Sequence, residues 1–116
     1  MSFEAKCHCG AVAVTVDADT PSKAVECNCS HCSIKALVLA AVPGDAVTIT
    51  SGEDQLETYR FNRKVIDHRF CTNCGVQPLS QGKGRDGQPM AMINLRCVPG
   101  IDLGTLEIAH FDGASL

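Results

Sequence analysis

Three cysteines lie within six residues of one another, at Cys27, Cys29 and Cys32. This density exceeds what core packing or a disulfide would need. Spacings of two and three residues allow the three thiolates to converge on one point, and such soft donors favour zinc. Structural zinc sites are closed by four protein ligands, whereas catalytic sites keep one position open for water or substrate. The chemistry of this trio therefore depends on whether another residue supplies a fourth ligand.

Two further pairs of thiols stand at Cys7 and Cys9 and at Cys71 and Cys74, and each pair ends in Cys-Gly. Glycine allows a tight turn behind each pair at no steric cost. Pairing the two gives four thiolates from separate hairpins, as in a structural zinc ribbon. A competing assignment joins Cys71 and Cys74 with Cys32 and either Cys27 or Cys29, and it leaves Cys7 and Cys9 free. The eighth cysteine, Cys97, is either an inert buried thiol or the fourth ligand of the trio.

Length, charge and cysteine usage narrow the class of protein. The 116 residues predict one domain, residues 1–116, without tryptophan and with eight cysteines. The spacings favour metal ligation in a reducing, cytoplasmic setting over disulfides. The net charge of −3 becomes about −6 when seven thiolates and two zinc ions are counted, which argues against nucleic acid as a partner. No apolar run would span a membrane, and the first residues lack a signal sequence, as a mature secreted chain also would.

The hydrophobic pattern predicts many short strands and no long helix, so the fold class is all-β. The segment 62–64 is predicted to join two strands of a hairpin. Residues 81–89 are predicted to form a flexible polar loop, either lining a site or at a solvated hairpin tip, and residues 112–116 are predicted to fray. The expected strands are 11–16, 24–26, 36–42, 46–50, 56–61, 65–70, 90–95 and a short edge strand within 103–111.

The ordered thiol motifs resemble those of the glutathione-dependent formaldehyde-activating enzyme family, whose reference member is S-(hydroxymethyl)glutathione synthase. The resemblance covers residues 7–97 and includes the segments 27–32, 70–75 and 93–97. It implies an Mss4-like β domain stapled by zinc. It also implies two zinc ions per chain, a catalytic one on the trio and a structural one on the residues matching Cys7, Cys9, Cys71 and Cys74.

An open zinc site with three thiolates would accept a substrate thiol and lower its pKa. The bound thiolate could then add to the carbonyl carbon of a small aldehyde, which makes the protein a carbon–sulfur lyase or synthase. The resemblance implies glutathione and formaldehyde as the substrates. Asn94 and Arg96 are candidates for substrate binding, and Arg96 with Lys83 or Arg85 could meet thiol carboxylates. Alternatively, Arg96 forms a salt link at the end of a strand, and Lys83 and Arg85 lie in a solvated loop without a role in binding.

The histidines are weaker candidates. His8 and His31 lie between ligands and are predicted to point away from the metal, and His68 is predicted to be structural. The chain departs from the family pattern at Val76–Ser80 and at Ser33–Lys35. The thiol, the aldehyde and the oligomeric state therefore stay open. The main rival is a non-catalytic zinc-ribbon module that binds protein, and a weaker one is a metal-storage or redox-sensing protein.

Overall fold

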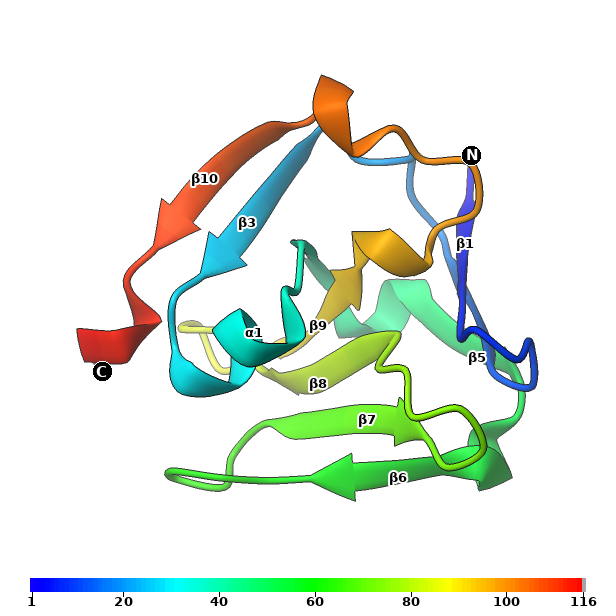
Figure 1. Cartoon of the computed structure of the whole chain (residues 1–116), viewed down its shortest axis with the longest axis horizontal. Coiled ribbons are helices and arrows are strands. Elements are labelled where there is room, and N and C mark those ends of the chain that lie inside the picture. The colour runs from blue at the N-terminus through cyan, green and yellow to red at the C-terminus, as the bar shows by residue number, and fades with distance from the viewer. Residues whose placement is uncertain (116) are drawn as a thin grey trace.

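The computed structural model describes residues 1–115 as two β-sheets and one short α-helix (Figure 1). The smaller sheet is antiparallel in the order β1-β2-β5, and the larger sheet has the order β10-β3-β4-β9-β8-β7-β6. Its neighbouring strands are antiparallel except β10 and β3, which are parallel. The strands are β1 (Phe3–Lys6), β2 (Ala13–Val16), β3 (Lys23–Cys27), β4 (Leu39–Pro43), β5 (Val47–Ser51), β6 (Leu56–Tyr59), β7 (Asp67–Cys71), β8 (Leu79–Lys83), β9 (Pro89–Asn94) and β10 (Glu107–Phe111), and the helix is α1 (Ser30–Lys35).

The all-β prediction is confirmed, with strands close to most of the expected positions. Valines of β2 pack in one core with residues of β8 and β9 and of the segment that follows β9. The fully buried side chains of this core include Val14, Val16, Leu79, Ile93 and Leu95. Within residues 1–115 no helix has the length and apolar character needed to cross a bilayer.

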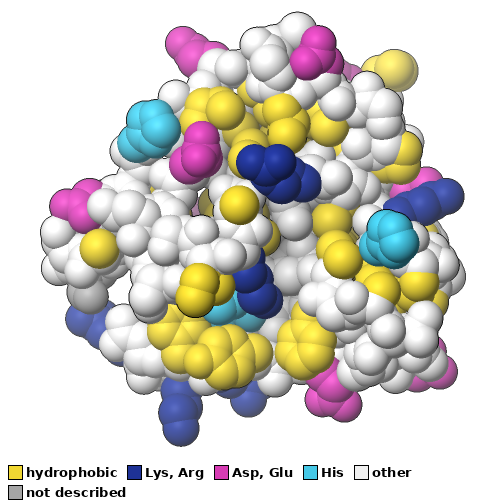
Figure 2. All heavy atoms as spheres, in the orientation of Figure 1, with side chains coloured by type: hydrophobic (Ala, Val, Ile, Leu, Met, Phe, Trp, Pro, Cys, Tyr) yellow, Lys and Arg dark blue, Asp and Glu magenta, His cyan; other side chains and the backbone are white. Residues whose placement is uncertain are grey.

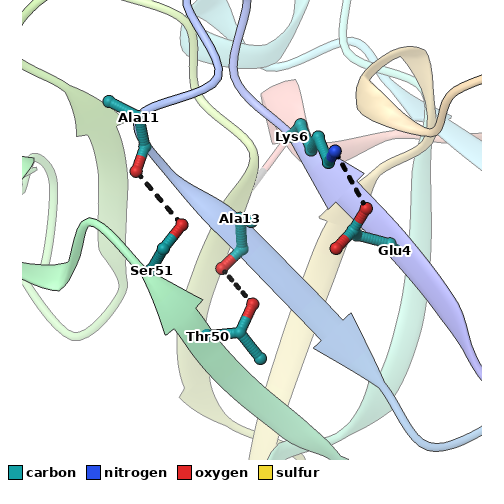
Figure 3. A network of polar contacts seen from close by, with 6 residues as sticks. All are labelled: Glu4, Lys6, Ala11, Ala13, Thr50 and Ser51. Atoms are coloured by element: carbon teal, nitrogen blue, oxygen red, sulfur yellow. Dashed lines mark hydrogen bonds and ion pairs between the residues drawn. The ribbon is translucent and has the colours of Figure 1, made fainter.

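The chain leaves the first thiol pair along β2, where the ladder with β5 changes register between Ala13 and Val14. Side chains of β5 bridge this irregularity, as Figure 3 shows. The hydroxyl of Thr50 donates to the carbonyl of Ala13 at 3.2 Å, and that of Ser51 donates to the carbonyl of Ala11 at 3.3 Å. The turn that holds Cys7 and Cys9 is therefore tied to the smaller sheet.

The structure differs from the prediction after the trio of thiols. Residues 36–42 were expected to form one strand, but β4 begins only at Leu39. The helix α1 precedes it and ends at Ala36, which has a left-handed φ of 54°. Leu37 and Val38 lie between α1 and β4, and both are buried. A six-residue helix offers too few turns for a hydrophobic period to reveal it.

Three other segments also differ from expectation. The strand expected from residue 11 begins at Ala13, because residues 7–12 form the thiol turn. The loop expected over 81–89 is shorter in the structure, because residues 81–83 belong to β8 and residue 89 to β9, and residues 84–88 form the tip of the β8–β9 hairpin. Residues 112–115 are ordered against the trio instead of fraying, and Leu116 lies outside the described residues. The predicted edge strand is β10.

Candidate metal centres

Four thiols meet where two turns lie side by side, and we call them the quartet: Cys7, Cys9, Cys71 and Cys74. Their sulfurs all lie within 4.8 Å of one another. The Sγ–Sγ distance is 3.6 Å from Cys7 to Cys9 and 3.7 Å from Cys9 to Cys71. A tetrahedron with metal–sulfur bonds of about 2.3 Å has edges of about 3.8 Å. The quartet could therefore hold a tetrahedral metal ion, and zinc fits this donor set.

The two turns of the quartet are built alike. Gly10 and Gly75 both have φ of +80°, and a Cβ at either position would meet no other atom. Glycine is therefore needed for the backbone conformation and not for space. The N–H of Gly10 donates to the carbonyl of Cys7, and the N–H of Gly75 donates to that of Cys71. The structure thus brings together the two Cys-Gly pairs that their shared glycine context grouped in the sequence.

The thiols of the quartet differ in their pKa values. Burial raises the pKa of the Cys7 thiol to about 11. Burial also opposes ionisation of Cys74, but hydrogen bonds from the backbone N–H groups of Cys9 and Val76 lower the pKa of this thiol to about 6. A metal ion that binds all four sulfurs must displace the remaining thiol protons, so its affinity falls as pH falls.

The other three thiols, Cys27, Cys29 and Cys32, form a separate cluster, which we call the trio. Cys27 ends β3, Cys29 is the N-cap of α1, and Cys32 lies inside the helix. Backbone N–H groups point at the sulfurs, since Cys32 donates to the Sγ of Cys29 at 3.3 Å and Cys29 donates to that of Cys27 at 3.5 Å. The three sulfurs also lie within 4.8 Å of one another, so the trio could hold a metal ion as well.

The thiols of the trio differ in burial and in acidity. Burial strongly raises the pKa of Cys32, and the neighbouring sulfur of Cys29 raises it further. For Cys29, burial opposes ionisation, but the hydrogen bond from the N–H of Cys32 outweighs it and lowers the pKa. The helix therefore contributes to the trio in two ways, because its first turn contains the thiol of Cys32 and also supplies the N–H group that donates to the sulfur of Cys29.

A cavity of about 390 Å³ opens beside the trio. Cys27 and Cys32 line it, together with Leu37 and residues from the end of β10. The charged groups of its lining are the carboxylates of Glu26 and Asp112. Figure 1 shows the segment from β3 into α1, which carries the trio, on the left, and the turns after β1 and β7, which carry the quartet, on the right. A small molecule in this cavity would thus reach the sulfurs of the trio and not those of the quartet.

Asn94 and Arg96 line a second hollow, of about 440 Å³, which shares Leu37 with the cavity beside the trio. The amide of Asn94 donates to the carbonyl of Gln77 at 3.0 Å and accepts from the N–H of Arg96 at 3.1 Å. The Nε of Arg96 donates to the carbonyl of Ala36 at 2.7 Å. Lys6, His8 and Lys35 also line this hollow, and basic side chains are visible in the middle of the face in Figure 2.

Cys97 lies apart from both groups of sulfurs. Its Sγ is 3.8 Å from the carbonyl of Gln77, and burial raises its pKa to about 11, with a further contribution from Cys7 and Cys74. The trio has three cysteines in the structure, and Cys97 is not among the thiols gathered there. Cys97 is half-buried, whereas a buried thiol was expected, and its inertness stays a prediction.

His31 and His68 belong to a stack of rings with Tyr59 and Phe61. The ring centroid of His31 lies 4.1 Å from that of His68 and 5.2 Å from that of Phe61. Burial lowers the pKa of His31 to about 4, helped by the charges of His68 and Lys35. Burial also lowers the pKa of His68. Both rings are thus neutral near pH 7, and His31 packs against other rings instead of joining the sulfurs.

Two features beside the trio escaped the sequence analysis. The ring stack was missed because His31, Tyr59 and His68 come from α1 and two strands that only the fold brings together. The contribution of His110, Phe111 and Asp112 to the cavity was missed because this segment was expected to form an isolated edge and a frayed end.

Comparison with known proteins adds a family and a fold. A sequence model of the glutathione-dependent formaldehyde-activating enzyme family matches residues 2–106. A crystal structure of a protein from Rhodobacter sphaeroides is similar, with a TM-score of 0.78 and 24% sequence identity. The alignment covers 92% of this chain and 100% of that chain. At this identity the likeness shows the fold alone. The family match includes all eight cysteines but ends just before β10.

Proposed function

The chain belongs to the glutathione-dependent formaldehyde-activating enzyme family, and from that premise we propose that it joins a thiol such as glutathione to a small aldehyde such as formaldehyde. In this reaction the thiol sulfur forms a bond to the carbonyl carbon. The π electrons of the C=O bond move to oxygen, and the thiol proton ends on that oxygen. The product is a hydroxymethyl thioether, and the reverse reaction makes the protein a carbon–sulfur lyase.

The observation that supports this proposal is the difference in ligand number between the two clusters. The quartet offers four sulfurs, which satisfy a tetrahedral ion, whereas the trio offers three and opens on a cavity. Three protein ligands with one free position are the usual arrangement of a catalytic zinc site. We therefore assign a structural zinc ion to the quartet and a catalytic zinc ion to Cys27, Cys29 and Cys32.

Zinc on the trio would supply a Lewis acid that lowers the pKa of a thiol near it. The residues around it have separate tasks. The N–H groups of Cys29 and Cys32 orient and stabilise the sulfurs that they contact. Leu37 and Phe111 line the cavity with apolar surface, which limits the water beside a reacting thiol.

Arg96 is the cation that we assign to a carboxylate of the substrate. It lines the hollow that adjoins the cavity, and the carbonyl of Ala36 holds its Nε in place. The amide of Asn94 already contacts Gln77 and the backbone of Arg96. Asn94 therefore positions Arg96 in this proposal, and the guanidinium of Arg96 meets the substrate through charge-assisted hydrogen bonds.

We also propose a cytoplasmic location, with small molecules and not nucleic acid as the partners. All eight cysteines have free thiols, which suits a reducing compartment. The net charge of −3 opposes binding to a phosphate backbone.

Exchange spectroscopy with ¹³C-formaldehyde and glutathione tests the proposed reaction. We expect the zinc-loaded protein to accelerate formation and breakdown of the hydroxymethyl adduct above the spontaneous rate. Cys32→Ser should return the rate to the spontaneous value, and Cys97→Ser should leave the acceleration in place. An unaccelerated rate with fully loaded protein and several thiols would refute catalysis, and a zinc-ribbon module that binds protein would become the better description.

A further inference from the structure

The C-terminal segment Glu107–Ser115 lies against the trio, and we call it the C-terminal wall. Its strand β10 runs parallel to β3, with Phe111 opposite Cys27 in the register. Figure 1 shows the end of the chain, in red, beside the segment that leads from β3 into α1. The family match ends at residue 106, so the wall is a part of the site that the match does not cover.

Asn28, which lies between two thiols of the trio, fastens the wall. Its Nδ2 donates to the carboxylate of Asp112 at 3.0 Å, and its Oδ1 accepts from the N–H of Ala114 at 2.8 Å. Its backbone N–H donates to the carbonyl of Phe111 at 3.1 Å. Hydrogen bonds from Ser115 and Asn28 lower the pKa of Asp112, which keeps this carboxylate ionised as an acceptor. The side-chain bonds are exposed to water, so each contributes modestly and the wall can open locally.

Gly113 brings the backbone of the wall onto the sulfur of Cys27. A Cβ at this position would overlap the Sγ of Cys27 and lie 3.3 Å from the Cβ of Cys29. The φ of Gly113 is not in the left-handed region, so the conformation itself does not need glycine. Glycine is needed here because the backbone lies directly over a sulfur of the trio.

The wall also shapes the cavity through which a thiol reaches the trio. His110, Phe111 and Asp112 line it on one side, opposite Ser33 and Ala36 of the α1 region. Bulk close to the sulfur of an incoming thiol would meet these residues, whereas a thiol on an unbranched carbon would not need to displace them.

We propose that the C-terminal wall determines which thiols react at the trio, by admitting those on an unbranched carbon and excluding those with branches next to sulfur. This specificity rests on the proposed thiol–aldehyde reaction, whereas the shielding of Cys27 by the wall does not. Asn28 and Gly113 act as positioning residues, since they hold the wall and do not touch the reacting carbon.

The first test measures access to Cys27 without any need for catalysis. The full chain with its metals is alkylated with iodoacetamide or with the larger N-(1-pyrenyl)maleimide, and the rate at each cysteine is read by peptide mass spectrometry. Asn28→Ala should speed labelling of Cys27 by the large reagent about fivefold and by the small reagent less. Cys9, in the quartet, is the internal reference and should keep its rates. Equal rates at Cys27 in both proteins would overturn the proposal.

A second variant guards against a local loss of structure in Asn28→Ala. Gly113→Ala should displace the wall from Cys27 and give the same preference for the large reagent. The matched control is Gly104→Ala, because Gly104 also lacks a positive φ and its added Cβ would meet only the Asp102 side chain. A control that changed labelling of Cys27 as much as Gly113→Ala would contradict the role of the wall.

The second test compares N-acetylcysteine with N-acetylpenicillamine, which differs by two methyl groups next to sulfur, in the formaldehyde reaction. The acetyl group blocks the amine, so that only the thiol adds to formaldehyde, and rates are divided by the spontaneous rates, which removes intrinsic differences in reactivity. The wild-type protein should favour N-acetylcysteine, and Asn28→Ala should reduce this preference about fivefold. An unchanged preference would overturn the specificity role. If no thiol reacts faster than spontaneously, the proposed function fails, while altered labelling of Cys27 would still support the wall.

Discussion

The quartet and the trio both consist of cysteines, but they differ in how much of the chain each cluster spans. In the quartet, Cys9 and Cys71 are 62 positions apart, with Cys9 in the turn between β1 and β2 of the smaller sheet and Cys71 at the end of β7 in the larger one. In the trio, all three thiols come from one stretch of six residues. Closing a long loop with a metal ion stabilises a fold, whereas closing a short one constrains little. A metal ion in the quartet would therefore hold the two sheets together, whereas a metal ion in the trio would not.

The surroundings of the two clusters also differ. The quartet lies between two turns that together offer four sulfurs, of which those of Cys7 and Cys71 are buried and that of Cys9 is exposed. The trio lies beside an open cavity and is covered on one side by a wall held with exposed hydrogen bonds. In this proposal, stability is therefore assigned to the quartet and reactivity to the trio, and variants of each cluster test this division.

The largest effect is expected from Cys71→Ser. This change removes a fully buried ligand of the quartet, so one metal ion should be lost and the link between the sheets with it. The loss should approach the whole stability of a small domain, about 5–15 kcal/mol. Circular dichroism during heating, with metal analysis, measures it. A folded variant with an unchanged melting temperature would mean that the quartet does not staple the sheets.

Cys29→Ser, in the trio, should have a large effect on activity and only a small effect on stability. We expect loss of the thiol–aldehyde reaction and of one metal ion, with a decrease of only about 1–2 kcal/mol in the free energy of unfolding. Urea denaturation and the exchange assay measure the two effects. Cys97→Ser is the matched control and should keep both metal ions. If Cys29→Ser unfolded the protein as Cys71→Ser does, the division of tasks between the clusters would be wrong.

Arg96→Met should produce a smaller, selective effect. The change removes a cation that lines the second hollow and contacts Ala36 at the end of α1. The KM for glutathione, which carries carboxylates, should rise about fivefold, whereas the KM for the neutral thiol 2-mercaptoethanol should stay the same. Equal increases for both thiols would show that Arg96 only supports the chain at Ala36.

The smallest effect concerns pH and the ring stack beneath α1. The pKa values of His31 and His68 lie below their ordinary value of 6.5 because both rings are buried, and Lys35 lowers both while Asp67 raises that of His68. In this range the unfolded chain binds more protons than the folded one, so stability is present above pH 6.5 and is lost as pH falls towards about 4.

His68→Phe should therefore reduce the loss of stability between pH 7 and pH 5.5. Urea denaturation at both values, with metal content checked at each, measures the difference. If the free energy of unfolding fell equally in variant and wild type between the two pH values, protonation of these histidines would not contribute to the loss of stability at low pH. The quartet has no such stack, so its metal content should not respond to this variant.

Much of the architecture could be predicted from the sequence because its signals are local. Alternating valines predicted β2, and the shared Cys-Gly turns were enough to group Cys7 and Cys9 with Cys71 and Cys74. Glycines with positive φ leave a clear mark in a sequence, since other residues avoid that conformation.

The features that escaped prediction depend on contacts between distant segments. The helix α1 is six residues long, and a cysteine replaces the usual N-cap side chain, so no periodic or capping signal marks it. The wall is recognisable only when Gly113 lies on Cys27 and Asn28 holds Asp112. Hydrogen bonds and close approaches of this kind are properties of the folded chain and leave no local pattern.

The most direct test of the central claim is metal analysis of chelator-free protein, joined to the spectrum of the cobalt-substituted form titrated with glutathione. Two metal ions per chain are expected, with the absorption of one cobalt ion shifting as thiol is added and that of the other unchanged. That result would establish one closed and one open sulfur site. A single metal ion, or two that ignore the thiol, would mean that the trio is empty or closed, and the account of catalysis would fail.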